Sequence, residues 1–81
     1  MSAVTVYTRE NCYQCKLTYA DLDKKGIDYE LVDLDKNPDI FTRLKSEGHR
    51  ALPVVVSPIG TWAGLRFDML NQLQMACKAG V

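Results

Sequence analysis

The sequence predicts a single α/β domain over residues 1–81, in which a four-stranded mixed sheet is flanked by three helices. Three observations lead to this prediction. Short runs of β-branched and aromatic residues alternate with segments of helical periodicity. Asn-Pro and isolated glycines mark the expected helix boundaries. A chain of 81 residues can bury one core and is too short for two. The resulting element order is β-α-β followed by α-β-β-α.

The first half of the chain predicts a β-α-β unit. Residues 4–7 (VTVY) form an expected strand, and Asn11 is the expected N-cap of the helix that follows. The apolar face of this helix is formed by Cys15, Tyr19 and Leu22. Gly26 ends the helix, and residues 29–33 (YELVD) form the second strand. Because a helix crosses over between them, the two strands should be parallel.

A second helix is predicted to start at Asn37-Pro38, with Asn37 as N-cap and proline at the first helical position. Its apolar face is formed by Ile40, Phe41 and Leu44. Gly48 is expected to end this helix, as Gly26 ends the first helix.

The last third of the chain predicts a hairpin and a final helix. Residues 53–56 (PVVV) read as a buried strand, a Ser-Pro-Ile-Gly turn follows at 57–60, and residues 61–63 (TWA) return antiparallel. The last helix runs from Phe67 onward. Its buried face is expected to contain Leu70, Leu73 and Cys77.

Composition excludes several classes of function. The formal net charge is +0, and no cluster of Lys and Arg interleaves with aromatic residues, so the chain is not expected to bind nucleic acid. No apolar run approaches the roughly 18 residues that a membrane span requires. The N-terminal residues lack the features of a signal peptide. Three cysteines are an odd number, which argues against a disulfide framework. We therefore expect a cytoplasmic monomer in a reducing compartment.

The C-x-x-C pair at Cys12 and Cys15 is the strongest chemical signal. A disulfide across two residues closes too small a loop to stabilise the fold appreciably. Residues three apart on a helix have Cβ atoms about 5–6 Å apart, and a disulfide needs a Cβ–Cβ distance of about 3.8 Å. A small change in the first turn of the helix is therefore enough to make or break the bond. At a helix N-terminus Cys12 is favoured as the thiolate. We therefore expect Cys12 to attack and Cys15, on the buried face, to resolve.

Metal binding is the competing interpretation of these cysteines. A structural zinc site takes four ligands, usually as two close pairs. Beyond Cys12 and Cys15 the chain offers only Cys77 and His49, each alone in the sequence. No metal and no cofactor are therefore expected.

The sequence resembles the NrdH-type redoxins, in the glutaredoxin-like branch of the thioredoxin superfamily, over almost its whole length. The motifs that carry the resemblance are V-Y-T-R-E-N-C-Y-Q-C, D-K-K-G-I-D-Y-E-L-V-D, A-L-P-V-V-V and W-A-G-L-R-F-D. The resemblance implies a thioredoxin-like fold and a thiol–disulfide oxidoreductase with a redox-active Cys12–Cys15 disulfide. It implies thioredoxin reductase as the electron source and the large subunit of class Ib ribonucleotide reductase as the client.

The resemblance also implies further site residues. Pro53 should be a cis-proline that faces the cysteines, and the backbone of Leu52 should pair with an extended client segment. The segment from Trp62 to Arg66 should pack and hydrogen-bond beside this loop. The residues expected to contact substrate or partner are Tyr13, Gln14, Leu52, Pro53, Trp62, Gly64, Leu65 and Arg66. Four of these, Tyr13, Leu52, Trp62 and Leu65, could supply a flat apolar surface around the thiols.

Two alternatives remain at this point. One is a glutaredoxin reduced by glutathione, although this chain has C-Y-Q-C, A-L-P and A-G-L-R-F-D where that branch typically has C-P-Y-C, T-V-P and a double glycine. The other is a binding module that holds zinc or a shared iron–sulfur cluster through Cys12.

Overall fold

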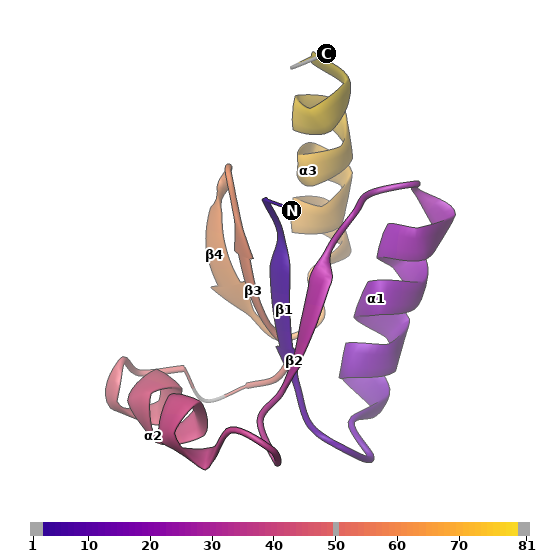
Figure 1. Cartoon of the computed structure of the whole chain (residues 1–81). Coiled ribbons are helices and arrows are strands. Elements are labelled where there is room, and N and C mark those ends of the chain that lie inside the picture. Colours follow the sequence, from indigo (N-terminus) through magenta and orange to yellow (C-terminus); the bar gives the residue numbers. More distant parts are fainter. Residues whose placement is uncertain (1–2, 50, 80–81) are drawn as a thin grey trace.

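The computed structural model describes residues 3–49 and 51–79 (Figure 1). The elements are β1 (Thr5–Thr8), α1 (Tyr13–Lys24), β2 (Glu30–Asp33), α2 (Pro38–Ser46), β3 (Val54–Ser57), β4 (Gly60–Ala63) and α3 (Phe67–Ala79). This order confirms the predicted β-α-β, α-β-β-α arrangement. No helix in the described ranges is long and apolar enough to cross a membrane.

The four strands form one mixed sheet in the order β2-β1-β3-β4. β1 pairs parallel with β2, as expected from the helix between them, and antiparallel with β3. β3 and β4 form the predicted antiparallel hairpin, closed by the Ser57–Gly60 pair. The four-stranded mixed sheet with three helices confirms the thioredoxin-like fold.

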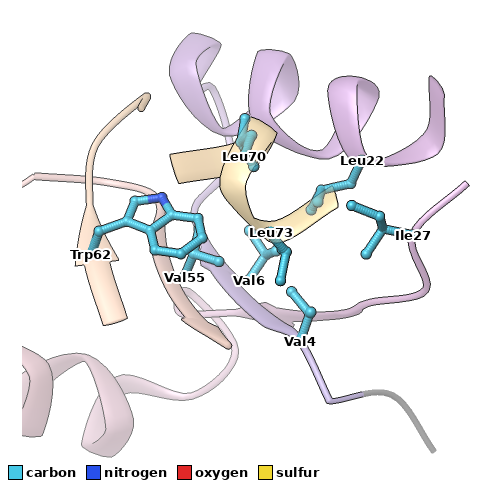
Figure 2. Packing of buried hydrophobic residues seen from close by; sticks show 8 residues of the cluster. All are labelled: Val4, Val6, Leu22, Ile27, Val55, Trp62, Leu70 and Leu73. Atoms are coloured by element: carbon cyan, nitrogen blue, oxygen red, sulfur yellow. The ribbon is translucent and has the colours of Figure 1, made fainter. Parts of the chain in front are cut away.

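Helices cover both faces of this sheet, with α1 and α3 on one side and α2 on the other (Figure 1). Alternation along the strands sorts the side chains between the two layers. The row Val6, Val55 and Trp62 runs across the sheet and packs under α1 and α3 with Leu22, Leu70 and Leu73 (Figure 2). The neighbouring row Tyr7, Val54 and Ala63 packs with Leu34 and Leu44 under α2.

The glycines end the first two helices as predicted. α1 ends at Lys24 with Lys25 as C-cap, and Gly26 follows with φ +69°. α2 ends at Ser46 with Glu47 as C-cap, and Gly48 follows with φ +92°. A left-handed residue directly after a helix is the position that glycine adopts without a Cβ clash.

The register of the sheet places several loops at one end of the molecule. Tyr7 near the end of β1 pairs with Val54 at the start of β3, so residue 53 lies at the end of the sheet from which residues 9–12 leave β1. The start of α1 and the end of β4 lie at this same end, at the bottom of Figure 1. We call it the thiol end of the sheet, because it carries Cys12.

The prediction that Cys77 is buried is wrong, because this side chain is exposed. Leu70 and Leu73 on the same helix are fully buried against the sheet. The last turns of α3 extend past the sheet edge opposite the thiol end (Figure 1). Helical spacing alone did not predict this exposure, because it does not show where the sheet ends beneath α3.

Candidate active site

Cys12 stands at the start of α1, and its sulfur caps the helix. It is the N-cap residue with extended backbone, φ −95° and ψ 103°, and its Sγ accepts the N–H of Cys15 at 3.2 Å. Asn11, the predicted N-cap, instead adopts φ +63°, a left-handed conformation that asparagine tolerates. The prediction of Asn11 as the cap is wrong, because the neighbouring sulfur takes that role.

Cys12 and Cys15 are joined as a disulfide, with their Cα atoms 5.2 Å apart. The two sulfurs have different surroundings. Cys15 is 1% exposed and lies on the buried face of α1, whereas Cys12 is only partly buried. The geometry therefore leaves Cys12 accessible in part and Cys15 shielded.

The buried face of α1 contains one residue that sequence reasoning missed. Thr18 is fully buried, and its hydroxyl donates to the Gln14 carbonyl oxygen at 2.9 Å. This bond satisfies the hydroxyl inside the core. Its position three residues after Cys15 and four before Leu22 places it on the same stripe, which was the available signal.

The loop that leads to Cys12 is held by a carboxylate from the other half of the β-α-β unit. Asp35 follows β2, and one of its oxygens accepts the Arg9 Nε–H at 2.9 Å. The other oxygen accepts the backbone N–H of Glu10 at 2.9 Å. These two interactions, first the Glu10 N–H and then Arg9, lower the pKa of the Asp35 carboxyl. Sequence reasoning missed Asp35, because no local pattern links positions 25 residues apart.

The loop before β3 contains the cis peptide bond that the family resemblance implies, between Leu52 and Pro53. Pro53 is buried, and its carbonyl oxygen accepts the N–H of Gly64 at 2.8 Å. Gly64 has φ +85°. The segment after β4 is therefore hydrogen-bonded to the proline loop, as expected. That Pro53 faces the cysteines stays a prediction.

Five further predicted contact residues reach the surface at least in part. Tyr13 is 73% exposed, Gln14 is also exposed, and Leu52 and Leu65 are half-buried. Arg66 is exposed and forms an ion pair with Asp68 at 2.9 Å. The Arg66 guanidinium in turn holds the pKa of the Asp68 carboxyl below its ordinary value.

Trp62 does not supply surface for a partner, contrary to the expectation. Its side chain is 5% exposed, because strand alternation turns it into the core beneath α1 and α3 (Figure 2). Its Nε1 atom is buried and has no hydrogen-bond partner among residues 3–49 and 51–79. The role of Trp62 in this state is packing.

A hollow of about 510 Å³ opens beside the disulfide. It is lined by Cys12 and Cys15, by residues 8–11, and by Lys16, Tyr19, Asp33 and Lys36. Its charged groups are of both signs, so it has no strong preference for an anion or a cation.

No group of three or more His, Cys, Asp or Glu within the described ranges could hold a metal ion. Of the two other predicted candidates, Cys77 lies on α3 and His49 follows α2. The four candidate zinc ligands therefore do not converge.

A thioredoxin-like fold with a C-x-x-C disulfide at the start of its first helix defines a thiol–disulfide oxidoreductase. Comparisons with known proteins agree. The glutaredoxin family model matches residues 4–58. The glutaredoxin-like protein NrdH of Escherichia coli strain K12 is 38% identical over 76 residues, 94% of each chain. Its counterpart in Salmonella typhimurium strain LT2 is 41% identical over 71 residues, 88% of each chain.

The solved structures give the same result. The glutaredoxin-like protein NrdH-redoxin from Escherichia coli, described as having a thioredoxin-like activity profile, superposes with a TM-score of 0.83 at 38% identity. The match covers 86% of this chain and 92% of that chain. This chain belongs to the glutaredoxin family, in its NrdH-type branch.

Proposed function

We propose that this protein is a cytoplasmic, monomeric dithiol carrier that takes electrons from thioredoxin reductase and passes them to class Ib ribonucleotide reductase through its large subunit. The observation that carries the proposal is the difference between the two sulfurs. Cys12 is accessible at the start of α1, and Cys15 is buried one turn behind it. The thioredoxin-like activity profile of the similar E. coli protein supports the choice of reductase.

The first step is attack by Cys12. In the reduced protein, the start of α1 and the Cys15 N–H favour the Cys12 thiolate, because both place positive charge beside the sulfur. The thiolate attacks one sulfur of the client disulfide. A mixed disulfide forms, the client S–S bond breaks, and the released client sulfur takes a proton.

The second step is resolution by Cys15. Its thiol loses a proton and attacks the Cys12 sulfur, which forms the intramolecular disulfide seen here and releases the second client thiol. The client gains two electrons and two protons. The reductase later supplies two electrons and two protons to this protein, which reduces the Cys12–Cys15 disulfide again. Because Cys15 is buried, it reacts with Cys12 before it can reach an external disulfide.

The surface around Cys12 supports a protein partner. Tyr13 is exposed beside the disulfide, and Leu52 and Leu65 are accessible in part. An aromatic residue with apolar neighbours is typical of protein contact surfaces. In this proposal an extended segment of the client pairs with the backbone of Leu52, next to the cis bond.

Glutathione is the weaker candidate for the reductant. Ala63 packs against the core under α2 at the place where the glutathione-dependent branch has a glycine. Arg66 already pairs with Asp68 through two hydrogen bonds, at 3.1 and 2.9 Å. A tripeptide carboxylate would have to compete with that pair for the guanidinium.

Single-cysteine variants test the proposed roles. Cys12→Ser should abolish electron transfer from thioredoxin reductase to ribonucleotide reductase, since it removes the only accessible sulfur of the pair. Cys15→Ser should form a mixed disulfide with the client that persists, because the resolving thiol is missing. Non-reducing gel electrophoresis and mass spectrometry would detect the trapped complex.

The matched control is Cys77→Ser, which removes an exposed cysteine at the opposite end of the molecule. It should leave electron transfer unchanged. Trapping by Cys12→Ser, with none by Cys15→Ser, would reverse the assigned roles.

A further inference from the structure

A second groove, of about 480 Å³, lies next to the cis-proline loop. It is lined by Arg9, Phe41, Lys45, His49, Ala51 and Leu52. Among these described residues none is acidic, and three carry nitrogen donors. This composition differs from that of the hollow beside the disulfide, where Glu10 and Asp33 offset the lysines.

The basic groups of the groove are held in place by Phe41. The Arg9 guanidinium carbon lies 4.8 Å from the centroid of the ring, and the Lys45 Nζ lies 4.2 Å from it. Cation–π contacts of this length are attractive and restrict long side chains that would otherwise be mobile. Asp35 offsets much of the charge of Arg9 by pairing with its Nε. Lys45 is therefore the main source of positive potential in the groove.

Arg9 connects the groove to the redox centre. It lines both this groove and the hollow that contains Cys12 and Cys15. Leu52, at the other side of the groove, directly precedes the cis bond. A peptide chain that passes Leu52 on its way to Cys12 would therefore run along the ring of Phe41 and the two cations above it.

We infer that this groove docks an acidic segment of the protein client, next to the client's reactive disulfide. This inference rests on the proposed function, in that the client is a protein. The ammonium of Lys45 binds Asp or Glu side chains of the segment, while Phe41 and Leu52 contact its aliphatic parts. The groove thus selects among disulfides by the charge of the residues beside them.

Two peptides test the inference. They contain the same intramolecular disulfide and differ only in their flanking residues, which are Glu in one and Lys in the other. The second-order rate constant for reduction of each by the fully reduced protein is measured at low and at high salt. We expect the acidic peptide to react about tenfold faster at low salt. The difference should shrink at high salt, because exposed charges are screened.

Charge reversal in the groove identifies the residue responsible. Lys45→Glu should remove or invert the preference for the acidic peptide, and Lys45→Gln should reduce it. The matched control is Lys24→Glu, which makes the same change of charge at the end of α1 remote from the groove (Figure 1). It should retain the preference. Reduction of 2-hydroxyethyl disulfide, which is uncharged, should be the same in all four proteins and shows that the thiols are intact.

The outcomes separate this inference from the proposed function. Equal rates for both peptides in the wild-type protein, or a preference unchanged in Lys45→Glu, would overturn the inferred docking role of the groove. Either result would leave the proposed electron-carrier function standing. If neither peptide is reduced but 2-hydroxyethyl disulfide is, the groove does not dock peptide segments, and the result also counts against the proposed protein client. Competition by a short oligothymidylate as strong as by an unreactive acidic peptide would also overturn the inference, since the groove would then bind any polyanion.

Discussion

At the residue scale, the two cysteines of the C-x-x-C pair differ in their surroundings. Cys12 and Cys15 lie three residues apart, yet only Cys12 is accessible. The sulfur of Cys12 takes the capping position and accepts the N–H of Cys15. The loop before it is fixed by Asp35, which binds Arg9 and the backbone of Glu10. The loop that leads to Cys12 is thus held by a carboxylate that is remote in sequence.

Asp35→Asn tests this carboxylate. The pKa of Asp35 is lowered in the folded protein, chiefly by the Glu10 N–H and then by Arg9. A lowered folded pKa gives stabilisation that is present above the unfolded value of about 4 and is lost as pH falls through the folded pKa. The variant should therefore have a lower free energy of unfolding than wild type at pH 7. The difference should disappear in acid.

Urea unfolding of the wild type and of Asp35→Asn, from pH 7 into the acid range, measures the difference in the free energy of unfolding. Asp28→Asn is the control, because it makes the same change at an exposed position in the loop before β2. It should show a smaller effect at pH 7. A deficit in Asp35→Asn that is equally large at both ends of the range would contradict a role for the ionised carboxylate.

At the element scale, the segment after β4 supports the loop before β3. Gly64 donates its N–H to the Pro53 carbonyl at 2.8 Å, and its φ of +85° makes this approach possible. A Cβ at Gly64 would lie 3.6 Å from the Cβ of Ala51, an ordinary contact. The requirement for glycine is therefore conformational.

Gly64→Ala should lower the free energy of unfolding by about 1–2 kcal/mol, the cost of a left-handed conformation for an L-residue. It should also slow reduction of a protein disulfide, since the hydrogen bond to the proline loop is disturbed. Urea unfolding and the rate of client reduction measure the two effects. Gly26→Ala is the matched control, with φ +69° and open space around the added methyl. It should lose similar stability without slowing reduction, and equal slowing in both variants would contradict the role of the Gly64 contact.

Sequence patterns predicted the elements well for identifiable reasons. Each strand contains β-branched or aromatic residues, and a glycine with positive φ follows each of the first two helices. The C-x-x-C motif, at Cys12 and Cys15, predicted both the redox centre and the difference in burial.

What the sequence did not predict depends on tertiary structure. Asp35 reaches Arg9 and Glu10 across the β-α-β unit, which no local period encodes. Helical spacing placed Cys77 on a buried face, but it carries no information about where the sheet ends. Trp62 was expected to contribute to a flat apolar surface around the thiols, whereas strand alternation turns it inward.

At the scale of the whole molecule, the fold gathers the functional parts at one end of the sheet. The end of β1, the start of α1, the loop into β3 and the end of β4 meet there (Figure 1). The opposite end carries the exposed Cys77 on the overhanging turns of α3. The loop between β1 and α1 supplies the reactive Cys12, and the loop into β3, supported by the segment after β4, supplies the cis-proline. Segments far apart in the sequence therefore meet at the thiol end.

The source of electrons is identified by comparing two reducing systems. The oxidised protein is offered NADPH with thioredoxin reductase, and in parallel NADPH with glutathione reductase and millimolar glutathione, and consumption of NADPH is followed with the same protein disulfide as acceptor. Consumption should be rapid with thioredoxin reductase and slow or absent with glutathione, because a glutathione carboxylate would have to compete with Asp68 for the Arg66 guanidinium. Comparable turnover with glutathione would make this protein a glutathione-dependent glutaredoxin, and consumption with neither system would contradict its role as an electron carrier.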